Sequence, residues 1–329
     1  MCDKMISYPF LSLWDYFRHK YSIFIISPYF ISTLYPIYGV FPTFVPIMWK
    51  LFLLPMLLLQ FTSVDREFRN ATDYTSCRQK LEEMLPQAAP GAEKAEVLWR
   101  LSRIALMQGE QAADKKAKRE LHNQGIRYAQ EGIQEDPKNE QCYMWHCANV
   151  GRECMTHGLA DQAKAVPAMQ KDLTTILDVL GRVRCSEAWQ GLSELYWKHP
   201  FKSKESAMNF ARRAAYTIPS DELRLSTYLY LAQLLEERDW SADKRAAQAA
   251  AHNSKYSGKA KSNIDKYAVY DGSDDQMPWL KGAIGEVSDE EEAEALIQYA
   301  LSRYKACKDL SPVDKKDFEA IQQWQKNLK

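Results

Sequence analysis

The pattern of apolar and polar positions divides the chain into an apolar N-terminal segment, residues 1–64, and a longer part with helical periodicity. No charged side chain occurs between Tyr21 and Trp49, and apolar residues continue after Lys50. This length permits a membrane span, with 21–41 or 43–63 as the best windows. Prolines that would kink a helix interior interrupt both windows: Pro28, Pro36, Pro42, Pro46 and Pro55. Two interpretations of 21–63 stay open, a membrane anchor and untypical sequence without a function.

From residue 95 the apolar positions fit a 34-residue helix–turn–helix repeat. The first helix of the first unit has two large residues and one small residue at the positions where paired helices meet: Leu98, Leu101 and Ser102. The second helix has small residues at its crossing positions and a proline that stops it: Gly125, Ala129, Gly132 and Pro137. Small side chains let helix backbones approach closely, so this spacing predicts an antiparallel helix pair.

The pattern then restarts three times. In the second unit Tyr143 and Cys147 take the large and small positions, but the second helix, near Met169 to Leu180, is degenerate. The third unit is the best copy, with its two helices marked by Trp189, Leu192, Ser193 and Tyr196, and by Ala207, Ala211, Ala214 and Pro219. The fourth begins with Tyr228, Leu231, Ala232 and Leu235 and continues into an Ala-rich helix around Ala246, Ala247 and Ala250. Because each unit leaves an apolar face exposed, stacking of neighbours supplies the core.

These elements predict an all-α, tetratricopeptide-like helical solenoid with repeats over 95–253. A linker and first helix precede it at 65–94, and a loop follows at 254–287. At 288–329 two C-terminal capping helices close the open end. Ser288 and Glu291 form a capping box that starts one of them, at about 289–306. Ser311-Pro312 starts the other, which carries Phe318, Ile321 and Trp324 on one face.

Composition supports the helical prediction and removes several function classes. The part after residue 64 is rich in Ala, Leu, Glu, Lys and Gln, which favour helices. The 43 basic and 43 acidic residues give a formal net charge of zero. That balance lacks the basic footprint of a dedicated nucleic-acid binder. Seven scattered cysteines, an odd number, indicate reduced thiols in a cytosolic protein.

The residues of the first two units resemble the regulator of microtubule dynamics family. The resemblance rests on residues 95–103, the Tyr128-Ala129 helix, Asp136-Pro137 and the aromatic segment Tyr143 to Trp145, and it covers about 75–253. It implies a tetratricopeptide-like domain that associates with microtubules and spindle structures. Some members of that family carry an N-terminal membrane segment and act at organelle surfaces.

Catalytic motifs are missing from the sequence, which has no P-loop, no dinucleotide-binding glycine motif, no nucleophile elbow and no zinc-protease motif. We therefore predict a non-enzymatic protein without a cofactor. One cluster of possible metal ligands stands out: Cys142, His146, Cys147, Cys154 and His157. On one helix these side chains point in different directions, so four ligands would not converge, and we predict no metal site.

In the predicted stack the inner concave surface is aromatic and net basic. It is lined by Trp99, Arg100, Arg103, Trp145, Arg152, Gln190, Glu194, Trp197 and Lys198. Guanidinium groups pair with carboxylates or phosphates, so an acidic peptide such as a tubulin tail, or an anionic lipid head group, would suit this surface. The alternative interpretation is that the tryptophans pack between helices and the arginines are solvated.

A second candidate surface consists of exposed basic residues in two stretches. They are Lys115, Lys116, Lys118 and Arg119, and, after the repeats, Lys255, Lys259, Lys261 and Lys266. Such clusters attract an acidic lattice or an anionic leaflet in spite of zero net charge, although many charge runs are only solvated helix faces.

We therefore expect a non-enzymatic helical-repeat protein that associates with microtubules and regulates their dynamics in a spindle or chromosome-segregation context. Its partners would be tubulin, microtubules or a microtubule-associated protein, and not nucleic acid. The expected location is the cytoplasm, at microtubules, the spindle or spindle poles, with anchoring to an intracellular membrane through 21–63 as an added expectation. The alternative is a membrane-anchored organelle-contact tether or lipid-binding module that uses the same helical domain.

Overall fold

The computed structural model describes residues 61–329 except 200, 257, 270–276, 283 and 328–329. Within this part of the chain the regular structure is helical and no strand occurs, so the predicted all-α fold is confirmed. The predicted anchor at 21–63 lies outside the described residues except for its last three. Among the helices that the structure describes, none has both the length and the apolar character that a membrane span requires.

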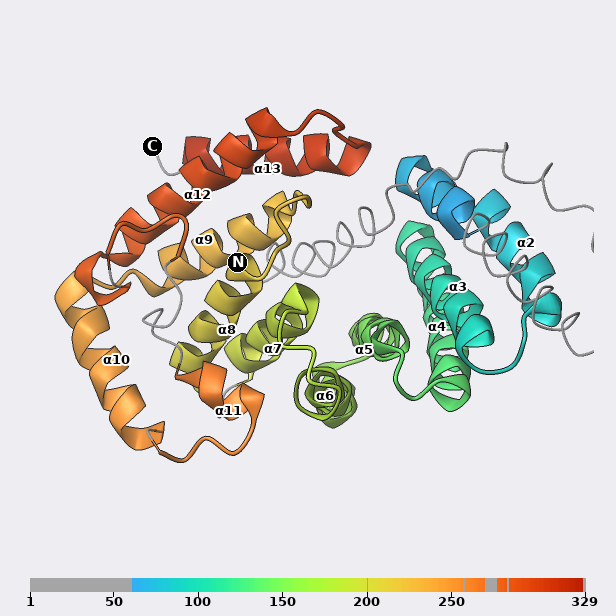
Figure 1. Cartoon of the computed structure of the whole chain (residues 1–329), viewed down its shortest axis with the longest axis horizontal. Helices are drawn as coiled ribbons and strands as arrows, with labels where there is room; N and C mark the ends of the chain where they lie inside the picture. Colours follow the sequence, from blue (N-terminus) through green and yellow to red (C-terminus); the bar gives the residue numbers. More distant parts are fainter. Residues whose placement is uncertain (1–60, 200, 257, 270–276, 283, 328–329) are drawn as a thin grey trace, which may run out of the picture.

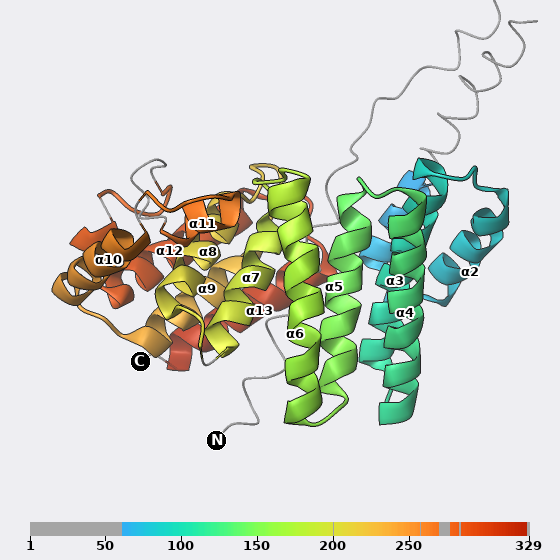
Figure 2. The ribbon, with the colours of Figure 1, turned by 90° about the horizontal axis from the view of Figure 1, so that it is seen from below.

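The first three repeats stack as helix pairs in the predicted order (Figures 1 and 2). The pairs are α3 (Ala92–Gln111) with α4 (Lys115–Glu135), α5 (Glu140–Met155) with α6 (Leu159–Thr174), and α7 (Ser186–Lys198) with α8 (Lys204–Tyr216). A π-helical turn, Thr175–Val179, follows α6, where the sequence predicted a degenerate helix. Each pair also packs against the next one, as a solenoid requires.

Small residues let α4 pack closely between α3 and α5. Ser102 Oγ donates to the carbonyl oxygen of Gly125 at 2.8 Å. A Cβ atom added at Gly125 would lie 2.3 Å from Asn149 Oδ1, and one added at Gly132 would lie 2.6 Å from Cys142 Sγ. Both distances are far shorter than a van der Waals contact. At the predicted crossing positions Gly125 and Gly132, a larger residue would therefore meet the neighbouring helix.

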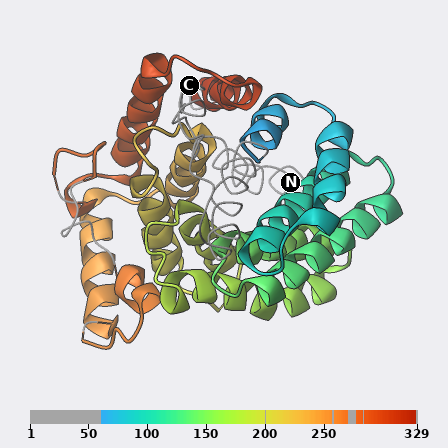
Figure 3. The same cartoon turned by 45° about the vertical axis from the view of Figure 1, so that its right-hand side comes forward.

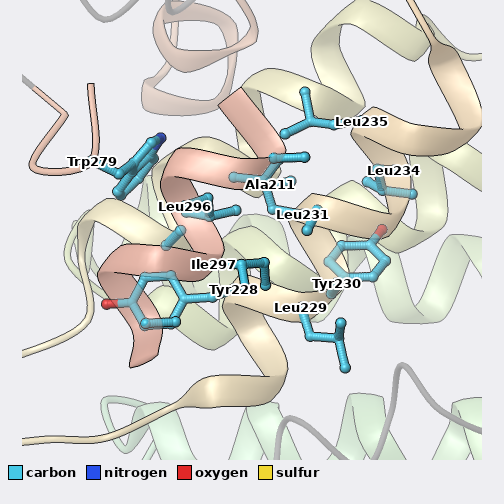
Figure 4. Close-up of a cluster of buried hydrophobic side chains, with 14 of the residues drawn as sticks. Ala211, Tyr228, Leu229, Tyr230, Leu231, Leu234, Leu235, Trp279, Leu296 and Ile297 are labelled. Atoms are coloured by element: carbon cyan, nitrogen blue, oxygen red, sulfur yellow. The ribbon is translucent and has the colours of Figure 1, made fainter. Parts of the chain in front are cut away.

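The fourth repeat departs from the prediction in its second helix. Its first helix, α9 (Leu225–Arg238), pairs with α12 (Asp289–Ala306) and not with the Ala-rich α10 (Ala242–Tyr256). Figure 4 shows Leu296 and Ile297 among the apolar side chains of this cluster, beside Leu231. Large apolar side chains bury more area than alanines do, which explains the exchange. The alanines predicted to form the second helix are exposed: Ala246, Ala247 and Ala250.

Buried ion pairs hold α12 in this position. Arg212 of α8 donates from Nη2 to Glu292 Oε2 at 2.8 Å, and Arg238 of α9 donates from Nη2 to Asp289 Oδ1 at 2.6 Å. Arg245 of α10 forms ion pairs with both carboxylates. These side chains are almost completely buried. Helix α12 is thus an integral part of the last repeat, joined to three other helices.

The two C-terminal helices begin where the sequence predicted. Ser288 and Glu291 form the predicted capping box at the start of α12. Helix α13 (Pro312–Asn327) buries Ile321, and its Trp324 donates from Nε1 to Glu236 on α9 at 2.6 Å. The predicted loop at 254–287 also contains helical residues: the end of α10, the short turn Ile284–Glu286, and α11 (Asn263–Ala268), which packs on α8. Six residues are too short to show helical periodicity in the sequence.

The N-terminal end of the described chain packs on the first repeat. Residues 61–70 are helical and are followed by α2 (Thr75–Met84) and the short turn Leu85–Gln87. Figure 3 shows the stack curving so that its first and last helices approach each other. Arg69 Nη2 donates to the carbonyl oxygen of Asp309, between α12 and α13, at 3.0 Å. The predicted boundary between 1–64 and 65–94 falls inside the helical residues 61–70.

Candidate partner-binding site

The arginines predicted for the concave face of the first repeat, Arg100 and Arg103, bind a carboxylate of the chain itself. Arg100 donates from Nη2 to Asp65 Oδ2 at 2.8 Å, and Arg103 donates from Nη2 to Asp65 Oδ1 at 2.6 Å. Arg100 also donates from Nη1 to Glu96 Oε2 at 2.7 Å. The exposed fractions of the two arginines are 1% and 0%. They are therefore neither solvated nor open, which differs from both sequence interpretations.

Aromatic rings enclose this ion pair. The guanidinium carbon of Arg100 lies 4.2 Å from the ring centre of Phe61, and that of Arg103 lies 3.6 Å from the ring centre of Phe68. Trp99 lies against both guanidinium groups, at 4.1 and 5.0 Å. Cation–π contacts of desolvated arginines stabilise such a site. Arginines thus bind a carboxylate beside aromatic rings between residues 61–70 and α3, but this carboxylate is the chain's own, and partner binding by Trp99, Arg100 and Arg103 stays a prediction.

Burial and the neighbouring charges shift the pKa values of this cluster. Burial alone would raise the pKa of Asp65, but the guanidinium groups of Arg103 and Arg100 outweigh it and lower that pKa. The pKa of Arg103 is lowered, mainly because burial removes its charge from water and in spite of the attraction of Asp65. Burial also raises the pKa of the neighbouring Cys77 thiol to about 11, so this cysteine is a neutral thiol near pH 7.

The predicted surface residues of the second and third repeats are also mostly buried. Trp145, Arg152, Gln190 and Glu194 belong to this group. Arg152 Nε lies 3.4 Å from Glu110 Oε1, which joins α5 to α3. Partner binding at these four positions stays a prediction.

Hydrogen bonds join α7 of the third repeat to α9 of the fourth. Gln190 Oε1 accepts from Thr227 at 2.9 Å, and Gln190 Nε2 donates to Glu194 at 3.1 Å. At the end of α7, Trp197 is half-buried and donates from Nε1 to Glu237 at 3.1 Å. Lys198 is the one predicted residue of this surface that the structure places in solvent. Direct binding by Trp197 and Lys198 likewise stays a prediction.

The predicted basic patch falls into two separate parts. Lys115 and Lys116 are exposed at the start of α4, and Lys118 is half-buried. Arg119 donates to Thr156, at the end of α5, and so helps to hold α4 against α5. The second part, with exposed Lys259, Lys261 and Lys266, leads into α11 at the far end of the stack (Figure 1). The side chain of Lys255 lies outside the described residues.

The Cys and His residues of the predicted metal-ligand cluster have separate surroundings. Cys142 is buried against α3, where its thiol approaches the carbonyl oxygen of Ala95 at 3.8 Å. His146 Nδ1 lies 2.6 Å from Asp172 Oδ2, and His157 Nε2 lies 2.6 Å from Glu153 Oε1. Cys147 is buried against α6, where its thiol lies 3.8 Å from the carbonyl oxygen of Met169, and Cys154 is buried near the end of α5. Among the residues that the structure describes, no group of His, Cys, Asp and Glu is placed to hold a metal ion.

Sequence reasoning missed the residues that complete the arginine cluster. They are Phe61, Asp65 and Phe68 of the helical segment, and Glu96 of α3. The signal was present, since Phe61, Val64, Asp65 and Phe68 have the i, i+3, i+4, i+7 spacing of one helix face. It is hard to see because these residues follow directly on the apolar stretch, and the predicted boundary after residue 64 places Phe61 and Val64 in the N-terminal segment.

Residues 61–175 match the model of the family described as regulator of microtubule dynamics protein 1-3. No curated protein matches the chain. The matched range starts with the helical residues 61–70 and ends with α6, so it includes Asp65, the two arginines and the basic start of α4. The third and fourth repeats, which the sequence resemblance also covered, lie outside it. The predicted resemblance is confirmed over this range: residues 61–175 are similar to the regulator of microtubule dynamics family.

Proposed function

We propose that this protein is a non-enzymatic helical-repeat protein that binds microtubules directly and regulates their dynamics, with the spindle or chromosome segregation as its context. The observation that carries the proposal is the family match over residues 61–175. The curved stack of helix pairs supports it, because solenoids of this kind present extended surfaces to partners. Its location would be the cytoplasmic microtubule network. Membrane anchoring through 21–63 stays a prediction, since most of that segment lies outside the described residues.

We place the microtubule contact at the start of α4, on Lys115 and Lys116. Two of the predicted inner-face arginines, Arg100 and Arg103, are buried and bind Asp65, which favours a contact elsewhere. By contrast, the side chain of Lys116 is 85% exposed, and both lysines lie within the matched residues. Exposed lysines attract an acidic surface by local electrostatics, and the acidic tails of tubulin are such a surface.

The position of these lysines is unfavourable for the helix itself. They occupy the first turn of α4, where the helix dipole favours negative side chains. Glu120, one turn later, lies 4.0 Å from Lys116 and is itself exposed, so the pair stabilises little. Two lysines that oppose the dipole and have weak partners are consistent with a role in binding rather than in folding.

Co-sedimentation of the full chain with stabilised microtubules tests the proposal. The variant Lys115→Glu/Lys116→Glu should lose most of its binding, whereas Lys259→Glu/Lys261→Glu, a matched charge reversal outside the family match, should bind as the unaltered chain does. Glutamate at a helix start gains about 0.3–1 kcal/mol per site, so the first variant should be at least as stable as the unaltered chain. Equal loss of binding in both variants, or no loss in the first, would contradict the proposed contact.

Regulation of dynamics requires a second readout. We expect the unaltered chain to change the growth or shrinkage rate of single microtubules, and Lys115→Glu/Lys116→Glu to leave those rates near the values without added protein. If both proteins change the rates equally, then the start of α4 does not mediate the regulation.

A further inference from the structure

The helical residues 61–70 dock on α3 through one face. Phe61, Val64 and Phe68 are buried, and the side chain of Asp65, between them, is 14% exposed. The other side of the helix faces solvent at Ser63 and Arg66. The docked face presents two aromatic residues seven positions apart with a carboxylate between them. Together these three side chains form a compact recognition element.

The surface that receives this face is built for such an element. Two guanidinium groups one helical turn apart on α3 meet the carboxylate at 2.6–2.8 Å. Each guanidinium is covered by one ring of the docked segment, Arg100 by Phe61 and Arg103 by Phe68. The carboxylate thus meets both arginines while an aromatic residue on each side of it covers one of them, so the surface suits a helix with this pattern.

Asp65 does not satisfy every donor of this surface. Arg103 Nε and Nη1 are buried and have no hydrogen-bond partner in the part of the chain that the structure describes. Unsatisfied buried donors cost free energy, and the cost is larger for a charged group. Arg100 differs, because Glu96 accepts from its Nη1. An occupant with one more carboxylate near Arg103 would satisfy donors that the present occupant leaves unpaired.

We propose that the Arg100–Arg103 surface of α3 is a binding site for an acidic helix that carries a carboxylate between two aromatic residues, and that residues 61–70 are its resident occupant. A partner segment of this chemistry binds by taking the place of 61–70. Because Arg69 also joins this segment to Asp309, the exchange also releases the contact between the first and last helices. That ion pair involves an aspartate that is 86% exposed, so it resists the exchange little.

This inference goes beyond the proposed microtubule contact and does not depend on it. The lysines of α4 belong to a different surface, and the experiment below uses no polymer. The site could therefore fail while the microtubule contact holds, or the reverse.

Fluorescence anisotropy with labelled peptides tests the exchange. The probe is a peptide with the sequence of residues 61–72, and the receptors are the full chain and its variant Phe61→Ala/Phe68→Ala, which weakens the resident segment but keeps both arginines. The variant should bind the peptide at least about tenfold more tightly than the unaltered chain. A control variant, Ser63→Ala/Arg66→Ala, changes the solvent side of the same segment and should bind the peptide as weakly as the unaltered chain.

Altered peptides test the chemistry of recognition on the same receptor variant. Replacing the aspartate that corresponds to Asp65 by asparagine should weaken binding about tenfold or more, because a charged hydrogen bond is lost. A peptide with Arg69→Glu adds a carboxylate one turn further and should bind more tightly than the parent peptide. Adding Arg103→Gln to the receptor variant should remove the gain from the added carboxylate and reduce the effect of asparagine, because Arg100 still binds the aspartate.

Several results would overturn the proposal. Equal affinity of the peptide for the unaltered chain and the Phe61→Ala/Phe68→Ala variant would show that 61–70 does not occupy the site. Equal binding of the aspartate and asparagine peptides would show that the arginines do not recognise a carboxylate. If circular dichroism shows that the double variant loses its helices, the variant Asp65→Asn of the full chain takes its place as the receptor. If that folded variant does not bind the peptide more tightly than the unaltered chain does, the proposal is overturned.

Discussion

Glu292→Ala should destabilise the protein strongly, because this carboxylate joins α12 to α8 and α10. Glu292 is fully buried. Its two oxygens accept from Arg212 at 3.0 and 2.8 Å, and Arg245 also donates to it. Alanine would leave Arg212 with the Asn209 side-chain oxygen, at 3.3 Å, as its remaining hydrogen-bond acceptor among the described contacts. Arg245 would keep Asp289, also at 3.3 Å.

Two arguments give a similar magnitude for the loss of stability in Glu292→Ala. Removal of one partner from a buried ion pair costs about 3–5 kcal/mol, since the other charge stays buried without compensation. Burial alone would raise the pKa of Glu292, but Arg212 and Arg245 outweigh it and lower that pKa from its ordinary 4.5 to about 2. A difference of that size between folded and unfolded states corresponds to about 3 kcal/mol. We therefore expect a loss of about 3 kcal/mol in the free energy of unfolding.

The sign of the pH dependence follows from the direction of this pKa shift. A carboxylate whose pKa is lowered by folding stabilises the protein above its unfolded pKa, and this contribution disappears as the pH falls through 4.5 toward 2. The difference in stability between Glu292→Ala and the unaltered chain should therefore be largest near pH 7 and should shrink near pH 3.

Urea unfolding followed by circular dichroism at both pH values measures this difference. Glu294→Ala is the matched control, because Glu294 is exposed on the same helix and its loss should change stability by less than about 0.5 kcal/mol. The reasoning would be refuted if the two variants were equally stable at pH 7, or if the effect of Glu292→Ala were as large at pH 3 as at pH 7.

Three further variants test other parts of the fold. Burial, only partly offset by Arg224, raises the pKa of Glu222 to about 7, so ionising this carboxyl group costs stability as the pH rises from 4.5 to 7. Glu222→Gln should therefore stabilise the protein above pH 7 and have little effect near pH 4.5. Thermal unfolding across pH checks this, and an effect that does not change with pH would contradict it. Gly132→Ala should lower the free energy of unfolding by about 1–3 kcal/mol, because its methyl group would meet the Cys142 sulfur. In a double-mutant cycle, adding Cys142→Ala should restore part of that loss, and simple additivity of the two effects would show that the clash is not the cause. Ser288→Ala should lower stability by about 1 kcal/mol in the same unfolding assay through loss of the capping box, and no change would mean that this helix end does not depend on its cap.

Local spacing predicted the helix pairs well because close crossing leaves a strong trace in the sequence. Gly125 and Gly132 stand where neighbouring side chains leave no room, and Pro137 follows directly after α4 ends. The capping box of α12 was likewise readable, since Ser288 and Glu291 are three residues apart and bond to each other's backbone. Such features depend on residues that are close in sequence or repeat at a fixed spacing.

Pairings between distant segments could not be predicted in the same way. Helix α12 replaces α10 beside α9 because its large apolar side chains bury more area, and nothing in the spacing of the alanines of α10 reveals this competition. The carboxylate that binds Arg100 and Arg103 comes from Asp65, thirty-five and thirty-eight residues away. Sequence reasoning identified the arginines and their need for an acidic partner, but it could not show that the chain supplies one.

Pelleting of the full chain with microtubules across a salt titration tests the central claim most directly. Intact polymers should be compared with polymers stripped of the acidic tubulin tails. The account predicts pelleting at low salt that falls as salt rises and falls again when the tails are removed, because exposed lysines bind by screened electrostatics. Absence of pelleting at low salt, or pelleting that depends on neither salt nor tails, would contradict a direct contact through the basic start of α4.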